Sequence, residues 1–519
     1  MKKSVVIAAL VAGTLTIPFS VSAQYKTNDV AEKGSQTQEI LAQAESSETP
    51  VVITLEQALE IALSENVSVK VADMEIERTG YAKKGTYAAL FPQIDASAAY
   101  QRTIKKQVMY MDFDMSSLGG LVGGGTGEGT EIPDGTDASG AGAGTGTDDS
   151  SSSSSGGGME VGRWNTYSAG VTAAMPLVNA QLWQSLKISG LDVELAVEKA
   201  RSSRLETVTQ VKNAYYAILM AKEAFNVYKE VYENAVSNYD ETKKKFDAEK
   251  ISELELLRAK TTVANAIPNV YNAESSIVLA LWQLKAVLGV DLDMNLDVAG
   301  KLEDFADQML YDIHQHDSVS LDCNTTMKQL AVQSEMLAET IKLQKYASIP
   351  SLSLAFNYSL NAMTNDFKFS TYRWTPYSYV GLSLNIPIFA GGKRYQQIRQ
   401  ARNQHQQVLL QKDNTERQLK IAIRQSLTTM ETNMKSYYSA QDAVAMAAKG
   451  YSIAEKAYQV GRSTLIELND AQLALTQARL AEYQAIYNFV VAKSQLEQTL
   501  GQDFIEYPVS CLSRNQIDN

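Results

Sequence analysis

The sequence contains few of the side chains from which most catalytic and metal sites are built. Its 519 residues include three histidines and two cysteines, and no Ser/His/Asp or paired-carboxylate arrangement is recognisable. The net charge of −12, without a basic cluster, argues against nucleic acid as a partner. We therefore predict that the chain is not an enzyme, needs no cofactor and binds no nucleic acid.

Long apolar runs are also missing. After the N-terminal region, none approaches the roughly 20 residues that a membrane-spanning helix needs, so any membrane crossing would be made by strands. Near the N-terminus, two lysines, the apolar run 5–15 and small residues ending at Ala23 are typical of a secretory signal. We predict a signal peptide at 1–23, followed by a flexible polar arm at 24–50.

The few cysteines and histidines leave little room for metal binding. His314 and His316 flank one residue and precede Cys323, but a His-x-His pair on a helix points its rings apart and no fourth ligand follows. We expect surface histidines and no metal site. Two cysteines, Cys323 and Cys511, suit an exported chain without a disulfide framework, and the sequence leaves open whether they pair.

One pattern occurs twice and organises the chain. Around Gly461 an otherwise helical pattern breaks, which predicts the tip of a helical hairpin. The tip aromatic Phe246 stands 212 positions before Tyr458, and Glu255 stands 212 positions before Glu467. We predict two structural repeats, at 51–300 and 301–505, with a C-terminal tail at 506–519.

Each repeat also holds two segments in which apolar and polar residues alternate, as in half-buried strands. Each is about ten residues long, the length of a tilted transmembrane strand. The expected strands cover residues 94–101, 167–176, 351–360 and 380–386. A Gly/Ser-rich loop at 116–158 separates the first two, and it is either a surface-exposed functional loop or a neutral low-complexity expansion.

Very long helices follow Pro176 and Pro387. Roughly 65–70 residues at ~1.5 Å each give on the order of 100 Å, with apolar positions at heptad spacing. Each returns through its tip on a shorter helix, at 253–288 or 465–500. Four strands cannot close on themselves in a membrane, and such hairpins have no core of their own, so we predict that several chains share one structure.

Four motifs, taken together and in this order, resemble the TolC-like outer membrane efflux protein family. They are Thr54–Leu63 with Asn66, Leu90–Ile94, Pro387–Arg394, and Tyr458–Gln472. The resemblance covers about residues 51–505. The second copy of the first motif is degenerate at Asp312–Leu321, and the first copy of the Pro387 motif, at Pro176, lacks the double glycine.

The resemblance implies a mainly α-helical fold with a membrane β segment: long antiparallel helical hairpins forming an α-barrel, plus four transmembrane strands per chain. It implies a homotrimer with a 12-stranded β-barrel in the outer membrane and a long periplasmic extension. The implied function is the passive exit duct of an efflux pump or type I secretion system. Its partners would be outer-membrane lipid, a periplasmic adaptor protein and an inner-membrane transporter of the RND or ABC type.

The resemblance also assigns roles to single positions. Hairpin tips would close the periplasmic entrance, with acidic residues around the aperture and a tyrosine holding it shut. The positions are Glu467 and Asp470 for the aperture and ion selectivity, Tyr458 for the gate contact, Ser252, Glu255, Gly461 and Thr464 at the hairpin tips, and Pro176, Pro387, Gly391 and Gly392 at the barrel-to-tunnel junction. At the double glycine we expect a close backbone approach.

Simpler explanations exist for some of these residues. Glu467 and Glu255 each stand three positions after a hydroxyl residue, so each could merely complete a helix capping box. Asp470 lies beyond that position, and Tyr458 could be one more heptad aromatic. For the whole chain, the alternatives are a stand-alone porin, which would not need helices of this length, and a structural or adhesive coiled-coil protein that displays the Gly/Ser loop.

Overall fold

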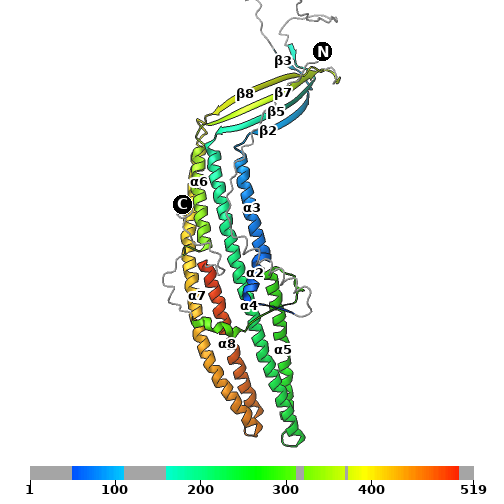
Figure 1. Ribbon diagram of the computed structural model, residues 1–519, viewed down its shortest axis with the longest axis vertical. Helices are drawn as coiled ribbons and strands as arrows, with labels where there is room; N and C mark the ends of the chain where they lie inside the picture. Colours follow the sequence, from blue (N-terminus) through cyan, green and yellow to red (C-terminus); the bar gives the residue numbers. More distant parts are fainter. Residues whose placement is uncertain (1–49, 110–158, 311–320, 369–371, 502–519) are drawn as a thin grey trace, which may run out of the picture. The chain divides into compact units, whose positions relative to one another are not determined.

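The computed structural model describes residues 50–109, 159–310, 321–368 and 372–501. The chain divides into two compact units, a helical one and a β-rich one built from residues 85–183 and 345–391. The β unit holds a sheet of four long strands, which lie side by side in Figure 1, and the helical unit holds the hairpins formed by α4 with α5 and by α7 with α8. No helix within the described ranges is both long and apolar enough to cross a membrane.

The β unit is a single antiparallel sheet with the strand order β2-β5-β7-β8. Its strands are β2 (Gln93–Arg102), β5 (Asn165–Val178), β7 (Ser351–Thr364) and β8 (Thr375–Asn385). A separate short pair, β3 (Gln107–Met109) and β4 (Met159–Val161), extends from the connection between β2 and β5. All four sheet strands were expected, but β8 begins five residues earlier than predicted, because its pairing with β7 continues to Asn361 opposite Thr375.

Register sorts the side chains of this sheet onto two faces. Ile94 pairs with Ala173, which pairs with Phe356, which pairs with Val380, so these four lie on one face. The same face carries alternate residues of every strand and is apolar over most of its length. The other face carries residues such as Ser97, Thr172, Asn357 and Ser383 and is mainly polar.

The chain repeats one element order across the two units. A helix leads to two strands, a long helix and a shorter return helix, first as α3, α4 and α5 and then as α6, α7 and α8. The long helices have 68 and 67 residues, or about 100 Å each at ~1.5 Å per residue. Bounds are α2 Leu55–Glu65, α3 Val67–Ala88, α4 Ala180–Asp247, α5 Glu253–Leu288, η2 Leu302–Leu310, α6 Thr325–Tyr346, α7 Lys393–Gln459 and α8 Leu465–Leu500.

One hydrophobic core holds both hairpins together at the roots of the return helices α5 and α8, where these pack against the middle of the long helices α4 and α7. It includes the fully buried Ile218 of α4, Leu288 of α5, Met430 of α7 and Phe489 of α8. It also includes Ile53 of β1 (Val51–Ile53), which pairs in parallel with β6 (Leu296–Val298). The capping box predicted at Thr54 begins α2 as expected.

Matching asparagines fix the two return helices at this root. Asn66 donates from Nδ2 to the carbonyl of Val287 at 2.6 Å, and Asn324 donates in the same way to Thr499 at 2.6 Å. The two asparagines are 258 positions apart. The second repeat therefore keeps the counterpart of Asn66 at Asn324, beyond the segment 312–321 that was expected to be the degenerate copy of the Thr54–Asn66 motif. Residues 311–320 lie outside the described ranges.

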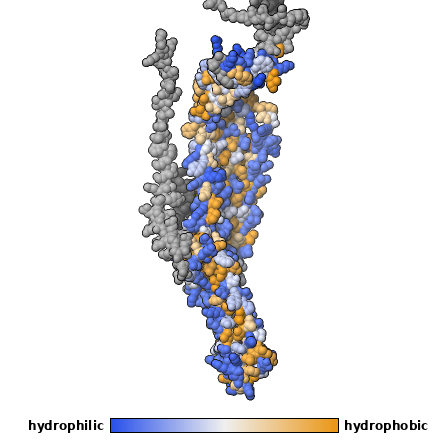
Figure 2. All heavy atoms as spheres, turned by 90° about the vertical axis from the view of Figure 1, so that its right-hand side faces the viewer, coloured by the Kyte–Doolittle hydropathy of each residue, from blue (hydrophilic) through white to orange (hydrophobic). Residues whose placement is uncertain are grey.

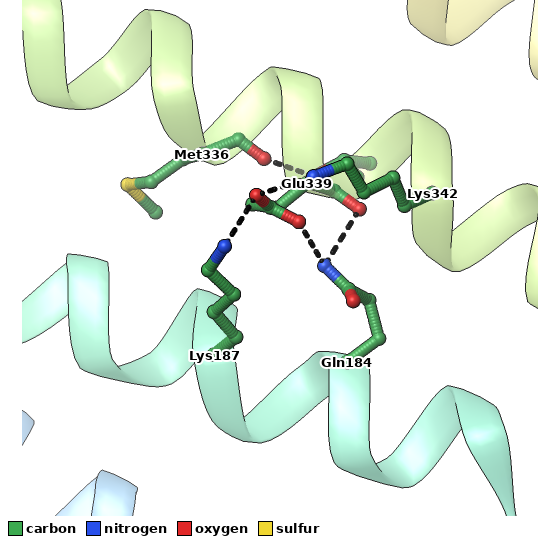
Figure 3. Close-up of polar contacts among 6 residues, drawn as sticks. Gln184, Lys187, Met336, Glu339 and Lys342 are labelled. Carbon is green, nitrogen blue, oxygen red and sulfur yellow. Dashed lines mark hydrogen bonds and ion pairs between the residues drawn. The ribbon is translucent and has the colours of Figure 1, made fainter.

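A buried carboxylate joins α4 to α6 (Figure 3). Glu339 is 4% exposed and accepts hydrogen bonds from Gln184 at 2.5 Å, Lys187 at 2.7 Å and Lys342 at 2.9 Å. Burial alone would raise the pKa of Glu339, but these three donors outweigh it and lower the pKa to about 2. The carboxylate is thus charged and fully partnered at neutral pH.

Candidate functional site

The tip of the second hairpin is a tight turn built around Gly461. Helix α7 ends at Gln459, Gly461 has φ 76°, and Thr464 caps α8. The amide of Arg462 donates to the carbonyl of Ala457 at 2.8 Å, which closes the end of α7. A left-handed residue at this point is what lets the chain reverse within five residues.

The first hairpin makes the same turn with a different residue. Glu249, 212 positions before Gly461, has φ 58° and is the one non-glycine with positive φ in the described part of the chain. The amide of Lys250 donates to Lys245 at 2.9 Å, which matches the bond at Arg462. We did not predict this position, because glutamate gives no local sign of a left-handed turn; only the repeat spacing could have indicated it.

Tyr458 ties the two hairpins of one chain together at their tips. Its side chain is 6% exposed, and its hydroxyl lies 2.6 Å from Oγ1 of Thr242 on α4. Because the hydroxyl of Thr242 already donates to the carbonyl of Asn238 at 2.6 Å, Tyr458 is the donor between them. The observed bond is therefore between the two hairpins of the same chain.

A lysine of α4 also contacts Tyr458. Lys245 donates to the carbonyl of Tyr458 at 3.1 Å, and its ammonium lies 4.4 Å from the centre of the Tyr458 ring. Lys245 also pairs with Glu241 at 2.9 Å. Tyr458 forms a small buried cluster with Leu465 and Leu468 of α8 and Ala259 of α5.

Glu467 completes a capping box, as one of the two interpretations expected. Its carboxylate accepts from the backbone of Thr464 at 3.0 Å while its amide donates to the Thr464 hydroxyl at 3.3 Å. Hydrogen bonds from the Ser463 hydroxyl and the Thr464 amide lower the pKa of Glu467. At the first tip, Ser252 caps α5 by accepting from the amide of Glu255 at 3.4 Å.

Asp470 lies near Glu467 on the exposed side of α8. Three positions separate them, which places both on one helix face, and both are exposed. Leu465 and Leu468 point instead into the buried cluster. Within the described ranges no hydrogen bond or ion pair engages the Asp470 carboxylate, so the capping explanation that accounts for Glu467 does not extend to it.

The two glycines before α7 do not make the close backbone approach expected of them within this chain. Gly391 and Gly392 have φ 58° and 79°, and a Cβ at either would meet no atom of the chain within 4 Å. The expectation of a close backbone approach is therefore wrong within this chain; the pair is needed for its left-handed turn before α7. Pro176 lies in β5 where the register with β7 becomes irregular, and Pro387 lies between β8 and α7.

The described residues contain no group of three or more His, Cys, Asp or Glu side chains that could hold a metal ion. His314, His316 and Cys511 lie outside the described ranges. Cys323 is disulfide-bonded, so it is not available as a thiolate ligand.

Known proteins resemble this chain in sequence and in fold. The family model described as outer membrane efflux protein matches residues 140–290 and 318–502. Outer membrane protein TolC of Escherichia coli K12 is 19% identical over 346 residues, which cover 65% of this chain and 70% of that protein.

Two solved structures illustrate the similarity in fold. The CmeC outer membrane channel of Campylobacter jejuni matches with a TM-score of 0.61 and 18% identity over 89% of this chain and 91% of that one. The open state of the MtrE outer membrane channel of Neisseria gonorrhoeae matches with a TM-score of 0.60 and 16% identity over 86% and 88%. At these identities the structural likeness shows the fold.

Proposed function

Because the chain belongs to the outer membrane efflux protein family, and is thus an outer-membrane protein with a long periplasmic extension, we propose that three copies form a passive channel-tunnel. In this proposal each chain gives four strands to a shared 12-stranded β-barrel and its hairpins to a shared α-barrel. The assembly is the exit duct of an efflux pump or type I secretion system. An adaptor protein and an inner-membrane transporter of the RND or ABC type complete it.

The observation that carries this proposal is the sheet with two open edges. Strands β2 and β8 stand at its ends, and among the described residues each has one side without a partner strand. Its apolar face is suited to lipid and its polar face to water, but unpaired strand edges are not tolerated in hydrocarbon. Pairing β8 of one copy with β2 of the next removes every edge.

Apolar side chains on the helices support the same assembly. Tyr271, Val278 and Trp282 lie on one side of α5 and are 66%, 41% and 48% exposed. Figure 2 shows apolar patches along the helical part, interspersed with polar side chains. Neighbouring chains would cover this side of α5, as an amphipathic hairpin requires.

The remaining boundaries belong to the same proposal. Residues 1–23 are the signal peptide, 24–50 the N-terminal arm and 506–519 the tail; the repeats run over 51–300 and 301–505. We propose no catalytic activity, and movement through the duct is driven by the transporter.

The mass of the detergent-extracted protein, corrected for bound detergent, tests the proposal. We expect three mature chains per particle. A monodisperse single chain would leave two open strand edges in the membrane, and the shared barrel would then have to be abandoned.

We further propose that the tips form the periplasmic gate. Three copies of Glu467 and Asp470 would place six carboxylates around one narrow opening, where a low-dielectric wall strengthens their field and favours cations. In planar bilayers under a salt gradient, Glu467→Ala with Asp470→Ala should move the reversal potential toward zero. Removing the exposed acids Glu274 and Asp442 gives the same charge change away from the tip and is the control; equal shifts in both variants would refute the assignment.

Tyr458 has its own test. Tyr458→Phe removes the hydroxyl that donates to Thr242 but keeps the ring in its cluster, at a cost of about 1 kcal/mol for the closed tip. We expect a larger single-channel conductance or more frequent openings. Unchanged conductance and gating would mean that Tyr458 is only a packing residue.

A further inference from the structure

The connections between the four sheet strands and the helices carry exposed apolar side chains. All four connections are at one end of the sheet, since α3 leads into β2, β5 into α4, α6 into β7 and β8 into α7. Six large apolar side chains in these connections, or in the helical turns beside them, are between 43% and 90% exposed. We call them the junction belt: Tyr87, Phe91, Trp183, Ile349, Ile388 and Phe389. All six belong to the β-rich unit.

The chain around the junction belt is uncharged. The stretches 85–94, 176–186, 346–352 and 384–392 contain no Asp, Glu, Lys or Arg. The first charged residue on the helix side of each stretch is a lysine, namely Lys84, Lys187, Lys345 and Lys393. Of these, Lys187 is paired with Glu339. An exposed apolar surface without charges is unfavourable in water and typical of a surface that another apolar phase covers.

The belt continues the apolar face of the sheet. On β8 the apolar residues Val380, Leu382 and Leu384 recur at every second position, and Ile386 and Ile388 keep this spacing beyond the end of the strand. These five side chains are between 55% and 90% exposed. The apolar surface of this strand therefore runs on into the connection to α7.

The height of the apolar face follows from the register. Away from the helices, Tyr100 stacks on Tyr167 and pairs with it, and Tyr167 pairs with Ala362; near the helices, Leu352 pairs with Leu384. Ten positions on β7, from Ala362 to Leu352, give ~33 Å at ~3.3 Å per residue, and ~25 Å across a membrane at a tilt of ~40°. The apolar band of a membrane-spanning sheet is about 25 Å high. A band that begins at the stacked tyrosines therefore ends at Leu352 and Leu384, and the junction belt follows directly along the chain.

We propose that the junction belt lies in the lipid interface of the periplasmic leaflet, so that the connections as well as the strands contact the outer membrane. The partner is the layer between phospholipid acyl chains and headgroups, where aromatic side chains are favoured. This rests on the proposed function, because the apolar face must be the lipid-facing one and the helices must extend into the periplasm.

A second copy of the chain is the other surface that could cover the belt. A neighbouring copy in a shared barrel would meet the sheet at its edge strands, β2 and β8. Trp183 and Ile349, however, adjoin the inner strands β5 and β7, and they are 63% and 43% exposed. Because the belt is spread over all four connections, lipid fits it better than a second copy does.

Bromine on lipid acyl chains tests the belt, because it quenches only those indoles that contact lipid. The full-length protein is reconstituted in phosphatidylcholine vesicles with and without brominated acyl chains. Its four tryptophans are Trp164, Trp183, Trp282 and Trp374. With four indoles in the chain, we expect Trp183→Phe to remove about a quarter of the total emission, all of it from the quenched part. The matched control Trp282→Phe, on α5, should remove a similar amount from the unquenched part.

Two further variants add an indole. Phe389→Trp should add emission to the quenched part, whereas Tyr438→Trp, at an exposed position of α7, should add it to the unquenched part. Acrylamide, which stays in the water, is the second quencher. Quenching of Trp183 and of the Phe389→Trp indole by acrylamide alone would place the belt in water, and quenching by neither agent would place it beneath a second copy. Either result overturns the inference.

The particle mass and the conductance of the same preparations show which proposal has failed. If the particle contains three chains and conducts in bilayers, but lipid does not quench Trp183, the junction belt is misassigned and the proposed function stands. If the particle is a single chain or does not conduct, the proposed function fails as well.

Discussion

Replacing Glu339 by glutamine should destabilise the helical unit in a way that depends strongly on pH. The carboxylate is 4% exposed and accepts from Gln184, Lys187 and Lys342 (Figure 3). Glutamine keeps the shape but, like a protonated carboxyl, cannot be the charged partner of two ammonium groups. The variant therefore removes the negative charge and one of the two acceptor oxygens.

The size of the effect follows from the pKa. The hydrogen bonds lower the pKa of Glu339 from 4.5 to about 2, and at ~1.4 kcal/mol per pKa unit this gives about 3 kcal/mol of stability. Because the folded pKa lies below the unfolded one, the contribution is complete above pH ~4.5. It is lost as pH falls from there to about 2, where the folded carboxyl also takes up its proton.

Unfolding followed by circular dichroism at 222 nm, at fixed protein and detergent concentration, measures this at several values between pH 7 and pH 2. We expect Glu339→Gln to be less stable by about 3 kcal/mol at pH 7, with the gap closing by pH 2. The control is Glu416→Gln on α7, which removes an exposed carboxylate that pairs with Lys420 one turn along that helix. This variant should leave stability unchanged. A gap for Glu339→Gln that stays constant across the whole range would refute the reasoning.

Further predictions concern the helical unit. Lys212→Met should cost about 3 kcal/mol, since it removes the ammonium 2.9 Å from the carboxylate of Glu497, a side chain that is 11% exposed. The double change that also makes Glu497→Leu should recover part of this in the same unfolding assay, because Lys493 interacts with Glu497 as well. Glu249→Gly should stabilise by about 1 kcal/mol, because glycine adopts its φ of 58° without strain, whereas Gly461→Ala at φ 76° should destabilise by a similar amount; opposite signs in thermal unfolding are the check. Gly80→Ala, in a helix where a Cβ meets nothing within 4 Å, should be neutral or slightly stabilising.

The elements that the sequence predicted well are those with local signals. The return helices were expected at 253–288 and 465–500 and lie there, because hydroxyl caps begin them and glycines end them. The alternation of apolar and polar residues predicted that the four strands exist. It did not predict where β8 begins, because Tyr377 and Tyr379 lie on the otherwise polar face and hide the alternation. Only the pairing with β7 extends the strand.

At the hairpin tips, the sequence predicted where the turns lie but not which residues contact one another there. Repeat spacing located both turns, but no sequence signal shows that the hydroxyl of Tyr458 donates to Thr242 across 216 positions. The close backbone approach expected at Gly391 and Gly392 is wrong within this chain, because close approach and positive φ both select glycine and a sequence does not distinguish them. Asn324 was overlooked although the spacing of 258 from Asn66 was available.

The roots of the two return helices are fixed by close backbone contacts. A Cβ on Gly289 would lie 2.7 Å from the carbonyl oxygen of Glu65, and one on Gly501 would lie 2.2 Å from that of Cys323. Arg201 also donates to the carbonyl of Gly501 at 2.9 Å. From these fixed points each return helix extends 36 residues, or about 54 Å, to its tip. A rotation of only about 5° at the root would sweep the tip sideways by about 5 Å over that length, roughly the rise of one helical turn. A small change in packing at the root is therefore geometrically enough to separate Tyr458 from its two hydrogen-bond partners on α4, Thr242 and Lys245.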